Sequence, residues 1–291
     1  MFEQLFAVIA PVFITAGIGY VWAKMGKSFD TELITSLVTQ VGTPCLVFAS
    51  LSNLAVSPAS LGTIAVVYAV VMAGMLVIGI SALRLMRLPL HSYLPSIIFP
   101  NAGNMGLPLA LFAFGQEGLS IAVGLFALHS ILQFTLGIWI ASGTASIRLL
   151  TRNPMILGVV VALPFLFFQE KPPVWVSNTM QLLAGIVIPL MVMMLGVSLA
   201  NLKVTRFRRA FAISVLRLGG GFGVGLATAT AFGLEGPMRG VLLIICTMPC
   251  AVFGYVFALR YKREPDDIAA AIVISTSLAF VILPFLLAYV L

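Results

Sequence analysis

Pro100-Asn101-Ala102-Gly103-Asn104-Met105-Gly106-Leu107-Pro108 interrupts a hydrophobic stretch of this 291-residue chain. A second interruption, Cys246-Thr247-Met248-Pro249-Cys250-Ala251-Val252-Phe253-Gly254-Tyr255, lies at a matching place in the other half. Proline lacks an N–H and clashes with the preceding turn, and glycine permits non-helical angles, so both stretches predict broken helices. In a bilayer such breaks persist only where the freed backbone groups face protein or a wet cavity. Two breaks in corresponding positions indicate the binding site of a membrane carrier.

The composition excludes an ordinary soluble domain. Hydrophobic residues make up 61% of the chain and charged residues 9%, whereas soluble proteins carry about 25% charged residues. We therefore expect an all-α membrane protein in which residues 1–291 form one transmembrane domain in the lipid bilayer. The formal charge of +7 comes from basic residues in short loops, which indicates topology rather than nucleic-acid binding.

Counting about 20 apolar residues per bilayer crossing predicts ten transmembrane helices. Glu3 before the first apolar run argues against a cleaved signal peptide. One set of loops holds thirteen Lys and Arg residues and the other set only Lys171 and Arg239. This asymmetry predicts a multi-pass protein of the cell (inner) membrane with both termini outside. The approximate spans are 4–24, 32–53, 60–84, 93–116, 119–141, 154–169, 175–200, 210–233, 239–260 and 267–290.

The polarity of the ten spans divides the chain into two inverted five-helix repeats, 1–147 and 148–291. Corresponding residues in the two halves support this division. Three ordered matches lie near one offset: Thr43–Phe48 with Ile188–Met193, Pro100 with Pro249, and Glu117 with Asp266.

Each predicted break creates a helix N-terminus whose N–H groups bind anions without any charged side chain. Two breaks facing each other would form one midplane pocket for a small organic anion. A polar pair in span five would line its wall. The predicted substrate-binding residues are Pro100, Asn101, Gly103, Asn104, Pro108, Thr247, Pro249, Cys250 and Tyr255 from the breaks, with His129 and Gln133 from span five. The alternative is that the breaks only kink packed helices and that His129 is neutral and bonded to a carbonyl.

Other features favour packing or surface roles. No metal site, cofactor or catalytic motif is expected, because Cys246 and Cys250 lack a nearby His or acid and no HExxH or GxSxG occurs. The run Gly219–Gly225 offers two small-residue pairs, 219/223 and 221/225, for close helix packing. Arg217, about 12 Å deeper than Arg209 along its helix, favours snorkelling to the cytoplasmic surface over substrate contact.

The acidic residues all lie at or near span ends, so a buried carboxylate pair for proton exchange is not expected. The run Glu264, Asp266 and Asp267 favours a solvated helix N-terminus over a gate.

Three motifs resemble one known family. Pro-Asn-x-x-x-Met-Gly-x-Pro at 100–108, Pro-x-x-x-x-x-Tyr-Val-Phe-Ala at 249–258 and Val-Gly-Thr-Pro-Cys-Leu-Val-Phe-Ala-Ser-Leu at 41–51 are similar to the fourth, ninth and second segments of the auxin efflux carrier family. The resemblance implies broken helices four and nine that cross at the midplane, as in bile-acid symporters and sodium/proton antiporters. It also implies elevator-type alternating access. Bacterial members of the family are associated with malate and malonate, and plant members with auxin.

The resemblance assigns roles to single positions. Asn101 matches the family's substrate-contacting asparagine, Pro249 matches the proline at the crossing, and His129 matches a polar substrate-facing position. Cys250 stands where plant members have an amide, and Gly254 replaces a proline. The long cytoplasmic loop of plant carriers is absent, which argues against auxin as the substrate.

The sequence thus predicts a secondary active or facilitative carrier of a small carboxylate such as malate, malonate or an auxin-like acid. A sodium-coupled symporter of bile-acid-carrier type is the alternative, and an anion channel or an intramembrane enzyme is less favoured. Coupling to Na⁺ or H⁺ and the choice between monomer and homodimer stay open.

Overall fold

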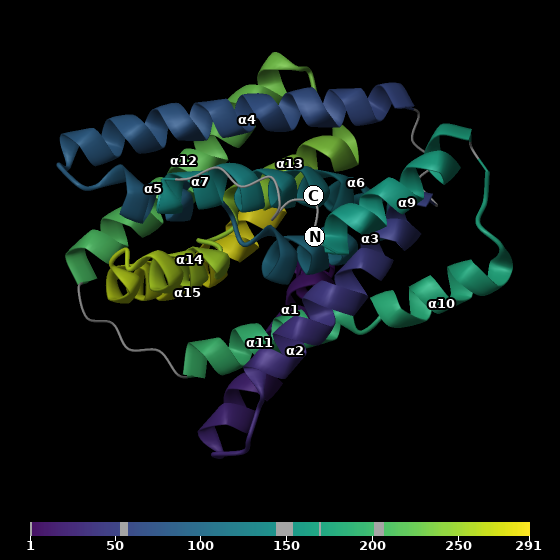
Figure 1. Ribbon diagram of the computed structural model, residues 1–291, viewed down its shortest axis with the longest axis horizontal. Helices are drawn as coiled ribbons and strands as arrows, with labels where there is room; N and C mark the ends of the chain where they lie inside the picture. The colour runs from purple at the N-terminus through teal and green to yellow at the C-terminus, as the bar shows by residue number, and fades with distance from the viewer. Residues whose placement is uncertain (1, 53–57, 144–153, 169, 201–206) are drawn as a thin grey trace.

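The computed structural model describes residues 2–52, 58–143, 154–168, 170–200 and 207–291, and the expected all-α fold is confirmed there (Figure 1). Three short π-helical turns, labelled η, interrupt the α-helices. The elements are α1 (Phe2–Lys24), α2 (Thr31–Leu37), η1 (Val38–Gly42), α3 (Thr43–Ser52), α4 (Pro58–Leu85), α5 (Leu90–Ile98), η2 (Ala102–Gly106), α6 (Leu107–Leu132), η3 (Gln133–Gly137), α7 (Ile138–Ser142), α9 (Pro154–Phe168), α10 (Val174–Ala184), α11 (Val187–Ala200), α12 (Phe207–Ala231), α13 (Gly236–Thr247), α14 (Phe253–Tyr261) and α15 (Pro265–Val290).

Several of these helices are long and apolar enough to cross a membrane. Six such stretches occur in the described residues, and α13 is apolar but shorter. The protein is therefore a multi-pass membrane protein, while the count of ten spans and the inverted repeats stay predictions. The six stretches are Thr31–Ala49, Gly62–Leu85, Ala102–Ser142, Val174–Met194, Phe207–Ala231 and Pro265–Val290.

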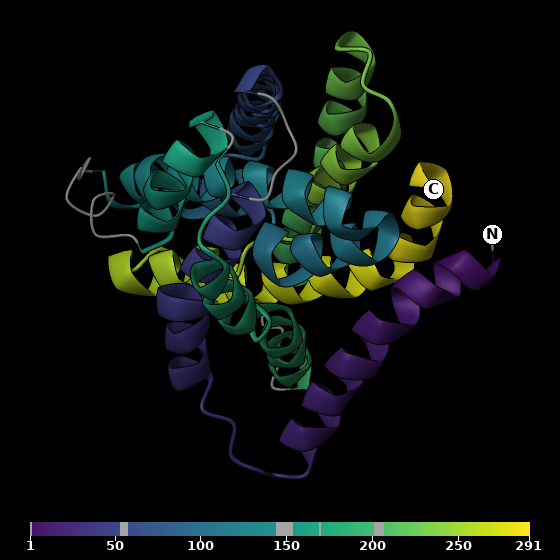
Figure 2. The same ribbon diagram turned by 90° about the vertical axis from the view of Figure 1, so that its right-hand side faces the viewer.

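The helices pack in two groups. In the first group α12 contacts α4, α5, α13 and α15, and α13 also contacts α6. In the second group α1 packs along α11, and α3 packs against α9 and α10. Figure 1 shows α10 and α11 along the edge opposite α4, and Figure 2 shows α1 at the edge opposite the hairpin of α12 and α13. The two ends of the chain lie near each other in both views.

Small residues set the closest helix contacts in both groups. A Cβ atom at Gly19 would collide with the backbone of Met193, so α1 and α11 can approach closely only because no side chain intervenes. A Cβ atom at Gly221 would collide with the Cys246 carbonyl of α13, and one at Gly225 would collide with the Cys246 side chain, which confirms the predicted packing of that pair. The other predicted pair, 219/223, faces open space within the described residues.

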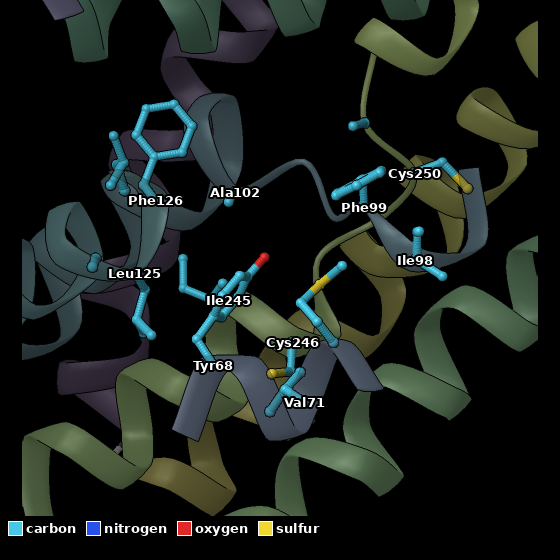
Figure 3. Packing of buried hydrophobic residues seen from close by; sticks show 14 of the residues in the cluster. Tyr68, Val71, Ile98, Phe99, Ala102, Leu125, Phe126, Ile245, Cys246 and Cys250 are labelled. Atoms are coloured by element: carbon cyan, nitrogen blue, oxygen red, sulfur yellow. The ribbon is translucent and has the colours of Figure 1, made fainter. Parts of the chain in front are cut away.

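Both predicted helix breaks are present. Between α5 and η2, and again between α13 and α14, the chain is extended, and the two extended segments cross in antiparallel orientation at Pro100 and Cys250. The Asn101 N–H donates to the Pro249 carbonyl at 2.7 Å, and the Ala251 N–H donates to the Phe99 carbonyl at 3.1 Å. Figure 3 shows Phe99 and Cys250 next to each other at this crossing. The breaks therefore satisfy part of each other's freed backbone groups.

Candidate functional site

A cavity of about 450 Å³ lies beside the crossing, a volume typical of small-molecule sites. All three π-helical turns contribute to its wall, and such turns are frequent at functional sites. The described lining contains no Asp, Glu, Lys or Arg side chain. The lining residues are Thr35, Val38, Thr39, Gln40, Thr43, Pro100, Asn101, Ala102, Gly103, Asn104, Phe126, His129, Ser130, Gln133, Ile138, Pro154, Met191, Met194, Ala251, Val252 and Phe253.

The first break supplies four of the predicted residues to this lining, Pro100, Asn101, Gly103 and Asn104. Asn101 is only 5% exposed, and its side-chain Nδ2 has no hydrogen-bond partner. Although Asn101 occupies the N-cap position of η2, its side chain makes no capping bond. A buried amide without a partner costs about 1–3 kcal/mol, so Asn101 offers a ligand in the cavity an unused donor.

His129 and Gln133 also line the cavity, as the sequence predicts. The His129 Nδ1 atom lies 2.8 Å from the Tyr68 hydroxyl, so the partner of this ring nitrogen is a side chain of α4 and not a backbone carbonyl. The rings of Phe99 and Phe126 pack against the imidazole. These contacts fix the orientation of His129 against the cavity wall.

The second break contributes a different kind of wall. Its lining residues are the apolar Ala251, Val252 and Phe253. Thr247 does not line the cavity, and its hydroxyl donates to the Leu243 carbonyl of its own helix at 2.7 Å.

The remaining predicted residues also lie outside the lining. The Pro249 carbonyl accepts the hydrogen bond from Asn101, and the Cys250 N–H donates to the Ser275 hydroxyl at 3.1 Å. Pro108 is buried at the start of α6, and Tyr255 packs against the hydrophobic core. The structure thus brings six of the eleven predicted residues together around the cavity and leaves five outside its wall.

The sequence interpretation does not include a stripe of threonines that also lines the cavity. Thr35, Thr39 and Thr43 follow one another at intervals of four residues along α2, η1 and α3, and all three line the cavity. Thr43 is 1% exposed and its hydroxyl has no hydrogen-bond partner. The signal was the spacing itself, because residues four apart share one face of a helix.

The snorkelling interpretation of Arg217 is wrong. The side chain is 1% exposed and does not line the cavity. Its guanidinium donates to the carbonyls of Ile97 at 2.8 Å and Ile98 at 3.0 Å, and to the carbonyl of Cys246. A cation in the middle of an apolar helix can therefore remain buried because the ends of two broken helices supply its acceptors.

The interpretation of the acidic run as a fully solvated helix end is wrong for Asp267. Glu264 and Asp266 are exposed, but Asp267 is buried. It accepts a hydrogen bond of 2.6 Å from the Tyr93 hydroxyl and lies 3.6 Å from the Arg209 guanidinium. Asp267 therefore ties α15 to α5 and α12.

The model of a family of membrane transport proteins matches residues 4–146 and 138–287, which together span nearly the whole chain. The chain belongs to the auxin efflux carrier family. An uncharacterized transporter of Methanocaldococcus jannaschii is 25% identical over 301 residues, covering 95% of this chain and 96% of that protein.

For this auxin efflux carrier family member, the positions to which the resemblance assigns roles fall in two places. Asn101 and His129 lie in the cavity wall. Pro249 and Cys250 lie at the crossing behind that wall, where their backbone atoms hold neighbouring segments. No group of three His, Cys, Asp or Glu residues that could hold a metal ion occurs in the described part of the chain.

Proposed function

We propose that the protein carries a small organic anion, such as malate or malonate, across the membrane by alternating access. The observation that carries this proposal is the unpartnered Nδ2 of Asn101 in a cavity where the helix formed by η2 and α6 begins. The first amides of a helix have no partner within it and carry partial positive charge. A carboxylate placed there would accept hydrogen bonds from these amides and from Asn101.

Neutral donors suffice for this ligand. Hydrogen bonds to charged groups stabilise by about 1.5–3 kcal/mol each, so a few donors around a carboxylate give micromolar to millimolar binding once the cost of ordering is subtracted. Asn104, His129 and Gln133 share the cavity lining with Asn101, and Thr43 lines the part of the wall that α3 supplies. A ligand of two carboxylates could use both parts of the lining.

The ten-span topology remains part of the proposal. The stretch Ala102–Ser142 is interrupted at Gly115, whose backbone has φ 63° and ψ −151°, and so would supply two crossings. The broken pair α13 and α14, together with α1 and α9, would complete the ten. The nearness of the two chain ends supports an even number of crossings.

The two helix groups support an elevator-type mechanism. We propose that the group containing α4, α5, α6, α12, α13 and α15 moves against the group of α1, α3, α9, α10 and α11. The cavity lies between them, since its wall takes residues from both. Thr35 and Pro154 of the lining follow closely after the basic residues Lys27 and Arg152 in the sequence. By the positive-inside rule the cavity would then face the cytoplasm.

The proposal is tested by counterflow. Purified protein in liposomes preloaded with unlabelled malonate or malate should accumulate the radiolabelled acid transiently, which a passive pore cannot do. Asn101→Ala should reduce the initial rate about tenfold or more, because it removes one hydrogen bond to a charged ligand.

The matched control is Asn178→Ala, the same substitution on α10 at an exposed position outside the cavity. It should transport like the wild type. Absence of counterflow across a panel of mono- and dicarboxylates, or equal rates for Asn101→Ala and the wild type, would overturn the proposal.

A further inference from the structure

Arg217 is the largest of the fully buried side chains in the described residues. It comes from the middle of α12, and its guanidinium reaches the last turns of two other helices. Two donors go to α5, at Ile97 and Ile98, and one goes to α13, at Cys246. These are the two half-helices that end at the crossing. The Arg217 side chain therefore links the two half-helices that lead into the breaks.

The charges match. The last carbonyls of a helix lack partners within it, and together they amount to about half a negative charge. Two such ends converge behind the cavity, which makes about one negative charge, and the guanidinium supplies one positive charge. Within the described residues no Asp or Glu forms a salt bridge with Arg217. The helix ends are thus its counter-charge, and a buried cation without one would be costly.

The surrounding helix is shaped for this contact. Gly221 follows Arg217 by one turn, and a Cβ atom there would collide with the Cys246 carbonyl and with the guanidinium itself. The absent side chain lets α13 approach α12 closely enough for its carbonyl to reach Arg217. In the sequence Arg217-x-x-x-Gly221 the arginine thus supplies the donors, and the glycine leaves the space in which the Cys246 carbonyl reaches them.

The space around the guanidinium is closed. A void of only about 10 Å³ adjoins it, lined by Tyr68, Pro100 and Cys246 among others, which is at the lower limit for one water molecule. The Nε atom of Arg217 has no hydrogen-bond partner. A hydrated metal cation would not fit beside the arginine.

In sodium-coupled carriers, unwound carbonyls and half-helix C-termini are the groups that coordinate the ion. We propose that Arg217 is a built-in cation that occupies this carbonyl cluster, so the crossing requires no Na⁺. Arg217 is a positioning residue: it fixes α5 and α13 relative to each other and neutralises their ends. The positive end of the helix formed by η2 and α6 is then left to face an anion.

Chemical rescue tests the assignment without any transport assay. Arg217→Ala in detergent should unfold about 10 °C below the wild type, because the substitution leaves two helix ends unneutralised. Millimolar guanidinium should restore at least half of the loss, since it can refill the site with the same donors and charge. Urea, which is planar and of similar size but neutral, should not.

Arg208→Ala is the matched control, because Arg208 is exposed near the start of the same helix. Guanidinium should not raise its melting temperature or that of the wild type. Equal responses of Arg217→Ala to guanidinium and urea would overturn the assignment.

A second experiment rests on the proposed function and uses the wild type, so it stays decisive if Arg217→Ala does not fold. Counterflow of malonate should be unchanged when Na⁺ is replaced by choline, and a tenfold or greater loss would overturn the inference. Arg217→Ala should transport at least tenfold more slowly and recover with guanidinium. If the wild type shows no counterflow, the proposed substrate is wrong, whereas the thermal experiment still decides the role of Arg217.

Discussion

The two helix breaks have nearly the same backbone and opposite chemistry. Each leaves an extended segment between two half-helices, and the two segments pair with each other at Pro100 and Cys250. The first break turns polar side chains into the cavity, among them Asn101 with its unused donor. The second presents Ala251, Val252 and Phe253 there.

The polar groups of the second break are already in use. The Pro249 carbonyl accepts from the Asn101 N–H, the Cys250 N–H donates to Ser275, and the Thr247 hydroxyl bonds within its own helix. The difference teaches that similar interruptions in the two halves of the chain can give similar backbones whose polar groups have different hydrogen-bonding partners. Under the proposed function, the first break recognises the ligand, and the second holds the first in place through its backbone hydrogen bonds.

The largest expected effect comes from adding a negative charge to the first break. Asn101→Asp should lower malonate counterflow by at least about 100-fold, because a buried like charge opposite a carboxylate costs several kcal/mol. Cys250→Ala, at the paired position of the second break, should stay within about twofold of the wild type. If Cys250→Ala abolishes transport in a protein that still folds, the division of roles is wrong.

A smaller effect, on stability rather than on transport, is expected behind the second break. Ser275→Ala removes the hydroxyl that accepts the Cys250 N–H at 3.1 Å. Since the site is buried, the unsatisfied donor should cost about 1–3 kcal/mol. Thermal unfolding should show a fall of several degrees, with the KM for malonate unchanged. A raised KM at unchanged stability would place the second break in ligand recognition.

The same substitution, threonine to valine, can be made in the cavity wall at Thr43 and in the second break at Thr247. Thr43→Val removes a buried, unpartnered hydroxyl from the part of the cavity wall that α3 supplies and should reduce counterflow about tenfold, which corresponds to one hydrogen bond of about 1.4 kcal/mol. Thr247→Val removes a hydroxyl bonded to Leu243 outside the cavity and should change the rate less than twofold. The reverse order would contradict the placement of the ligand between the first break and Thr43.

Much of the difference between the two breaks could be predicted from the sequence. Proline and glycine interrupt a helix at their own position, and asparagine adds a polar side chain there. The positions of both breaks and the cavity residues Asn101, Asn104, His129 and Gln133 follow from such local rules. The position of Thr247 and Cys250 outside the cavity could not be predicted. Their hydrogen bonds to Leu243 and Ser275 are seen only in the folded chain.

The two wrong interpretations have a shared physical cause. Snorkelling of Arg217 was inferred from its depth along one helix, but the acceptors that keep it buried come from α5 and α13. Likewise Asp267 was assigned to solvent by its place at a helix start, whereas Tyr93, 174 residues away in the sequence, covers it with a hydrogen bond. The burial of a charged residue depends on hydrogen-bond partners that come from distant parts of the sequence. The local sequence around the residue does not show which partners those are.

The smallest expected effect is a change in how transport depends on the length of the substrate, and it should differ between the two breaks. A Cβ at Gly103 would lie 3.0 Å from the ring of Phe126 and 3.4 Å from the methyl group of Met191, both ends of side chains in the cavity wall. Because these ends can shift, Gly103→Ala should slow malonate counterflow only about twofold, while a longer dicarboxylate should be slowed several-fold more. Gly254→Ala in the second break would instead approach the Ser96 hydroxyl at 2.9 Å, outside the cavity, and should affect all substrates alike. The ratio of rates for short and long dicarboxylates measures the difference, and an equal ratio in both variants would show that the first break does not border the ligand.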